Sequence, residues 1–154
     1  MTLVVRWTIR TAIVYLLIGF ILGETMLIGK VLGWPTLLLL PMHTHLLMVG
    51  FFTQMVFGVA FWMFPADLEK KFSQSLAQWT YILLNVGLWL RVIFEIIFNQ
   101  SDNPLAGWLM SIGGLLQLIA AMLFIYNMRG RVRGFLRELR SKMVSDAGAE
   151  SRQT

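Results

Sequence analysis

The chain has 154 residues, of which 57% are hydrophobic and 14% are charged, whereas soluble domains average about 45–50% apolar and about 25% charged residues. This composition excludes a soluble domain and predicts an integral membrane protein. There is no cysteine, which excludes disulfides, thiolate metal sites, iron–sulfur clusters and covalent c-type haem attachment.

Four apolar stretches follow one another along the chain, at residues 7–28, 36–64, 76–98 and 105–128. Each is long enough for a membrane span, which needs about 20 residues. Glycine, proline, asparagine and aspartate interrupt the stretches and mark turns. In the second stretch we expect the regular helix to begin near Pro41, because a proline in the first turn costs no hydrogen bond. The sequence predicts an all-α integral membrane four-helix bundle, a single domain over residues 1–154, with a basic tail at about 129–154.

Lysine and arginine are distributed unevenly between the two sides of such a bundle. Of these thirteen residues, all except Lys30 and Arg91 fall on one side of a four-span topology. Because cytoplasmic loops carry the excess of positive charge, we expect both termini to be cytoplasmic and the protein to lie in the cell membrane, a prokaryotic inner membrane. The net charge of +5 is then a topology signal, so no nucleic-acid partner is expected. The tail is an inside-positive anchor or lies on anionic headgroups.

The two histidines of the chain, His43 and His45, stand at the mouth of the second span. An ionisable residue inside a membrane is costly and is a functional-site hypothesis by default. The leading candidate is an axial ligand of haem iron, since haem is apolar and takes a neutral imidazole nitrogen. Successive residues rotate by about 100° around a helix. The two imidazoles should therefore point in nearly opposite directions and should not chelate one metal together.

The helical rotation assigns the two histidines to different faces. His43 shares a face with Gly50 and Gln54, and nearly with Gly58. His45 shares a face that we expect to meet lipid or other side chains, with Phe52, Val56 and Met63. Glycines allow a flat cofactor or a neighbouring helix to approach the backbone closely, which favours His43 as the ligand and Gly50 and Gln54 as cofactor contacts. The alternative is that His43 makes an ordinary hydrogen bond near the headgroups.

Three charged residues lie within the spans, in the same outer half as the histidines: Glu24, Arg91 and Glu95. Arg91 is a candidate for binding a haem propionate or a quinone oxygen, because its guanidinium presents a fork of donors. Alternatively, Arg91 pairs with Glu95 four residues later on the same face, or with Glu24. Asn85 and Gln117 lie deeper and are expected to form interhelical hydrogen bonds.

The motif MHTHL at residues 42–46, followed by Gly58 and by AFWMFP at 60–65, resembles the second helix of the catalytic subunit of haem-copper oxidases, particularly the nitric oxide reductase and C-type oxidase branch. Residues 15–23 and 84–91 are more loosely similar to the first and third helices. The resemblance implies that His43 is an axial ligand of a low-spin haem b, whereas His45 stands where the branch commonly has asparagine. The family's other metal ligands lie on later helices that four spans do not include. We therefore expect no reduction of oxygen or nitric oxide by the family's binuclear mechanism, and no enzyme of that kind.

These observations lead to one hypothesis, that the chain binds haem b non-covalently through His43 for electron transfer or for sensing a redox state or a small gas. No other helix carries a histidine, so a second ligand would come from a second copy, from a partner protein or from nothing. The simplest arrangement is a twofold homodimer, with His45 as a further candidate ligand. The competing hypothesis is a haem-free accessory or assembly subunit of a respiratory membrane complex, in which His43 hydrogen-bonds a partner.

Overall fold

The computed structural model describes residues 2–64 and 71–150. The predicted turn at residues 65–67, together with Lys70 and Arg152, lies outside these residues. In chain order the described elements are α1 (Leu3–Val31), the 3-10 turn η1 (Leu37–Leu39), α2 (Leu40–His45), the π-helix η2 (Leu46–Thr53), α3 (Gln54–Met63), α4 (Lys71–Ser101) and α5 (Pro104–Glu150).

Four segments are long and apolar enough to cross a membrane: Leu3–Val31, Leu37–Met63, Gln74–Ser101 and Pro104–Ser141. The prediction of an all-α membrane four-helix bundle is thus confirmed, and the side of the membrane on which each terminus lies stays a prediction. As expected, the regular helix of the second span begins near Pro41: α2 starts at Leu40, and Pro41 lies in its first turn. The basic tail is not separate, because α5 continues through it to Glu150.

The turns at one end of the bundle use the residues that such turns require. After α1, Gly33 has a φ of 75°, and the amides of Gly33 and Trp34 bond the carbonyls of Lys30 and Gly29. This is a Schellman motif, in which glycine is favoured at the left-handed position. Before α5, the side chain of Asn103 accepts a hydrogen bond from Leu105 N at 2.9 Å, so Asn103 caps the helix.

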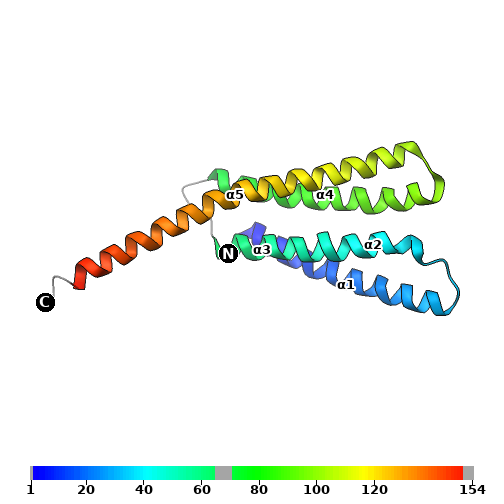
Figure 1. The fold of residues 1–154 in the computed structure, drawn as a ribbon, viewed down its shortest axis with the longest axis horizontal. Helices are drawn as coiled ribbons and strands as arrows, with labels where there is room; N and C mark the ends of the chain where they lie inside the picture. The colour runs from blue at the N-terminus through cyan, green and yellow to red at the C-terminus, as the bar shows by residue number, and fades with distance from the viewer. Residues whose placement is uncertain (1, 65–70, 151–154) are drawn as a thin grey trace.

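The spans form two antiparallel hairpins, α1 with α2–η2–α3 and α4 with α5 (Figure 1). We call the end with the α1–α2 turn and the two histidines the histidine end, and the other end, with Arg6 and the extension of α5, the basic end. The hairpins meet mainly through α4, which contacts α1, α2, η2 and α3. Helix α5 meets α3 through Phe124, whose ring stacks on Phe57 at 3.8 Å. Among the described residues, however, no Cα atom of α5 lies within 8 Å of α2 or η2. At the histidine end, α5 is therefore held by α4 and not by the second span.

The π-helix η2 directly follows the histidine motif. Its i→i+5 hydrogen bonds make wider turns than an α-helix, and the Thr53 hydroxyl donates to the carbonyl of Met48, five residues earlier, at 2.8 Å. This change of pitch alters the faces predicted for a regular helix. Phe52 is 60% exposed, whereas His45, predicted to share its face, is half-buried against α4.

Candidate functional site

His43 is half-buried between α2 and α1. Its Nδ1 lies 2.9 Å from the backbone carbonyl oxygen of Gly19. A carbonyl oxygen only accepts, so Nδ1 carries the proton and donates it, and Nε2 is the nitrogen with a free lone pair. Nε2 has no hydrogen-bond partner among the described residues. Metal-ligating histidines usually donate their second ring N–H to a carbonyl or carboxylate in this way, so the geometry of His43 fits that of an axial ligand.

The imidazole of His43 lies against Gly23 on α1. A Cβ atom at Gly23 would come within 2.9 Å of Cε1 and 3.7 Å of Nε2 of His43. A side chain at position 23 would therefore displace the ring, which is a packing reason for glycine here. Gly23 also lines an open surface depression on α1, together with Phe20, Ile21, Glu24 and Leu27. The candidate ligand thus lies next to a surface of α1 and not in the centre of the bundle.

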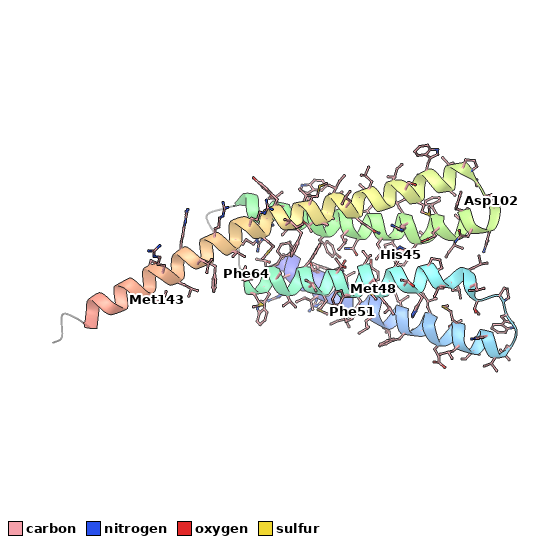
Figure 2. All side chains as sticks on the ribbon, in the orientation of Figure 1. His45, Met48, Phe51, Phe64, Asp102 and Met143 are labelled. Atoms are coloured by element: carbon pink, nitrogen blue, oxygen red, sulfur yellow. The ribbon has the colours of Figure 1, made fainter. Side chains whose placement is uncertain are left out.

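His45, on α2, is turned toward α4, and Figure 2 shows it between α2 and α4. Its Nδ1 lies 2.7 Å from the carbonyl oxygen of Pro41 and 3.4 Å from Oε2 of Glu95. Nδ1 therefore carries the proton, as in His43. The two imidazoles contact different helices, as the helical rotation predicts. No group of three or more histidine, aspartate or glutamate side chains in the described part of the chain is arranged to hold a metal ion.

The predicted cofactor face at Gly50 and Gln54 is covered by α1 and α4. A Cβ atom at Gly50 would lie 2.9 Å from Cδ2 of Tyr15 and 3.0 Å from Cδ2 of Leu88, and one at Gly58 would lie 2.8 Å from Cγ1 of Ile9. Glycine can allow close approach of a flat cofactor or of a neighbouring helix, and within this chain Gly50 and Gly58 allow the approach of a helix. Gly50 and Gln54 are buried, and their role as cofactor contacts stays a prediction.

Gln54 belongs to a chain of hydrogen bonds that links three helices. It donates to the carbonyl of Thr8 on α1 at 3.2 Å and accepts from Asn85 on α4 at 2.9 Å. Asn85 in turn accepts from the Tyr15 hydroxyl at 2.7 Å, which accepts from Trp89 Nε1 at 3.0 Å. The sequence indicated Asn85 as an interhelical partner. It did not indicate Tyr15 or Trp89, because an aromatic residue in a span is usually a packing or interface residue.

Arg91 forms neither of the ion pairs considered above with a described residue. Glu95 lies beside His45 instead. Nε of Arg91, Oε2 of Glu95 and Nε2 of Gln117 are buried without a hydrogen-bond partner among the described residues. Arg91 is directed toward α5, where its Nη1 lies 3.3 Å from the position of a Cβ at Gly114. The structure therefore does not bring Arg91 to His43, since one contacts α5 and the other α1.

Comparisons with protein-family models, with curated proteins and with solved structures found no match to this chain. The resemblance to haem-copper oxidases therefore rests on the sequence motifs alone.

Proposed function

We propose that the protein is a membrane haem b-binding protein in which Nε2 of His43 is an axial ligand of the iron, and that it serves electron transfer or the sensing of a redox state or small gas. The observation that carries the proposal is the hydrogen bond from Nδ1 of His43 to the Gly19 carbonyl. It leaves Nε2, the nitrogen that binds iron, without a partner among the described residues.

The polypeptide contributes the orientation of this ligand. The Gly19 carbonyl fixes the tautomer of His43 and limits rotation of the ring. Gly23, one turn later on α1, leaves room for the ring. A bound haem would supply a one-electron iron couple, whose potential depends on axial ligands and burial. A change in the distance between α1 and α2 would therefore change the orientation of the His43 ring.

A second axial ligand is proposed to come from a second copy of the chain. Within one chain His45 is turned toward α4, away from the α1 contact of His43. A twofold axis brings the same residue of two chains together, so two His43 side chains can serve one iron. We place both termini in the cytoplasm and the histidine end at the outer face of the cell membrane, with a respiratory-chain protein as the redox partner.

The test compares two matched variants, His43→Ala and His45→Ala, with the wild-type protein purified in detergent and supplemented with haem b. The wild type should show a Soret band and sharp α and β bands on reduction. His43→Ala should lose them and His45→Ala should keep them. Loss of haem in His45→Ala alone would assign the ligand to the α4 side. A wild type that stays colourless would leave the haem-free accessory subunit as the better account.

A further inference from the structure

Two polar side chains on the α4–α5 hairpin have buried donors without acceptors. They are Arg91, through Nε, and Gln117, through Nε2. Nor do the Nη atoms of Arg91 have a hydrogen-bond partner among the described residues. A buried donor without an acceptor costs free energy, more so when it is charged, and within hydrocarbon no water relieves it. We therefore ask which hydrogen-bond acceptor from outside this chain could satisfy the two donors.

Both side chains border one close helix contact. Gly87 on α4 and Gly113 on α5 face each other so tightly that a Cβ at Gly113 would lie 2.7 Å from Arg91 N. A Cβ at Gly87 would lie 3.1 Å from Cγ of Gln117. Arg91 and Gln117 therefore both border this contact, and Nη1 of Arg91 lies next to Gly114.

The missing acceptor should be anionic. The acidic residue nearest to Arg91 on its own helix, Glu95, is turned toward α2, with its Oε2 3.4 Å from Nδ1 of His45. This oxygen is also buried without a hydrogen-bond partner among the described residues, but it does not pair with Arg91, which is directed toward α5. The guanidinium thus keeps its positive charge without an ion pair in the described part of the chain. A carboxylate fits best, because it accepts two parallel hydrogen bonds from the guanidinium fork and has a further lone pair for Gln117.

The depth of Arg91 limits what can bring this carboxylate. Arg91 precedes the end of α4 at Ser101 by ten residues, or about 15 Å along the helix, which is about half of the 30 Å hydrocarbon thickness. Lipid phosphates lie at the interface and do not reach this depth. At the histidine end no described Cα of α5 lies within 8 Å of α2 or η2, so Arg91 is directed toward the helix of the α4–α5 hairpin that the second span does not contact there through its backbone.

We propose that Arg91 and Gln117 bind the carboxylate of an apolar molecule dissolved in the membrane. Two sources share this chemistry, a free fatty acid and a haem propionate. The second source rests on the function proposed above. The structure favours the first, because His43 contacts α1 whereas Arg91 contacts α5.

The test uses the full chain in phosphatidylcholine nanodiscs and measures equilibrium binding of radiolabelled oleate, with methyl oleate as the uncharged competitor. Arg91→Gln should weaken oleate binding by about tenfold or more, as expected for loss of a charged hydrogen bond. Arg129→Gln, the same change at an exposed position nearer the basic end of α5, should leave binding unchanged. Gly114→Leu keeps Arg91 but places a side chain against its guanidinium, since a Cβ there would lie 3.3 Å from Nη1, and it should also weaken binding. Because Arg91 makes no bond that the variant breaks, Arg91→Gln is expected to fold, which circular dichroism checks.

A second arm separates the two sources by loading the chain with haem b or with its dimethyl ester, which lacks propionate charges. If the carboxylate belongs to haem, the wild type retains haem b better than the ester, and Arg91→Gln removes this difference. In that case the binding of oleate does not saturate. If the carboxylate belongs to a fatty acid, both haem forms are retained equally and the binding of oleate saturates. Failure of the wild type to hold either haem form contradicts the proposed function alone, because the oleate arm is read independently. The inference is overturned if Arg91→Gln or Gly114→Leu binds oleate as the wild type does and the two haem forms are retained equally.

Discussion

Replacement of Asn85 by leucine should test whether the buried hydrogen-bond chain holds the two hairpins together. The Asn85 amide donates to Gln54 at 2.9 Å and to the Tyr81 carbonyl at 2.8 Å, and it accepts from Tyr15 at 2.7 Å. Leucine has a similar volume, so the change removes these bonds without opening a large cavity. Two of the three bonds connect different helices.

The expected loss follows from interhelical hydrogen bonds in membranes, which contribute about 0.6 kcal/mol on average and about 1.7 kcal/mol at most. With two such bonds lost, Asn85→Leu should lower the free energy of unfolding by about 1–3 kcal/mol. The assay is reversible unfolding in mixed micelles with increasing SDS, followed by the fluorescence of the six tryptophans.

The matched control is Asn99→Leu, the same substitution at an exposed position near the end of α4, for which a change within about 0.5 kcal/mol is expected. The double variant with Gln54→Leu should cost less than the sum of the two single variants, because it removes both partners of one bond. An Asn85→Leu protein as stable as Asn99→Leu would refute the reasoning.

Three further predictions concern packing, capping and stoichiometry. Gly50→Leu should push against Tyr15 and lower the free energy of unfolding by about 1–3 kcal/mol through overpacking; unchanged stability in the same SDS assay would contradict this. Arg131 is buried and donates to the carbonyl of Phe64 at the end of α3 at 3.0 Å, so Arg131→Met should destabilise by about 1.5–3 kcal/mol, and Arg133→Met, at an exposed position, by about 0.5 kcal/mol or less. If two chains share one iron on a twofold axis, the pyridine haemochrome assay should give about half a haem per polypeptide, and a ratio near one would rule out a shared iron.

The spans and their turns could be predicted from the sequence because hydropathy and helix punctuation are local properties. The placement of Pro41 in the first turn of α2 is one example. The separation of His43 from His45 follows from helical rotation alone, and the two side chains do contact different helices. The close approach permitted by Gly50 was also indicated, although the sequence did not decide between a cofactor and the Tyr15 ring that lies there.

Other features depend on tertiary contacts or on backbone geometry that hydropathy does not encode. The π-helix η2 (Leu46–Thr53) has the same apolar composition as an α-helix, so its wider turns could not be predicted. Phe52, Val56 and Met63 are exposed, as expected for a lipid-facing side, whereas His45 is half-buried against α4. Spacing favoured an Arg91–Glu95 pair, but Glu95 contacts His45 across the bundle. Such competition between partners can be resolved only when the helices are placed in space.

The central claim, that His43 is a ligand to haem iron, is tested most directly by the reduced-minus-oxidised visible spectrum of the purified wild-type protein after haem b supplementation. The account predicts a sharp α band and a shifted Soret band, typical of six-coordinate low-spin b-type haem, both of which disappear in His43→Ala. A featureless wild-type spectrum, or an unchanged spectrum in His43→Ala, would contradict it.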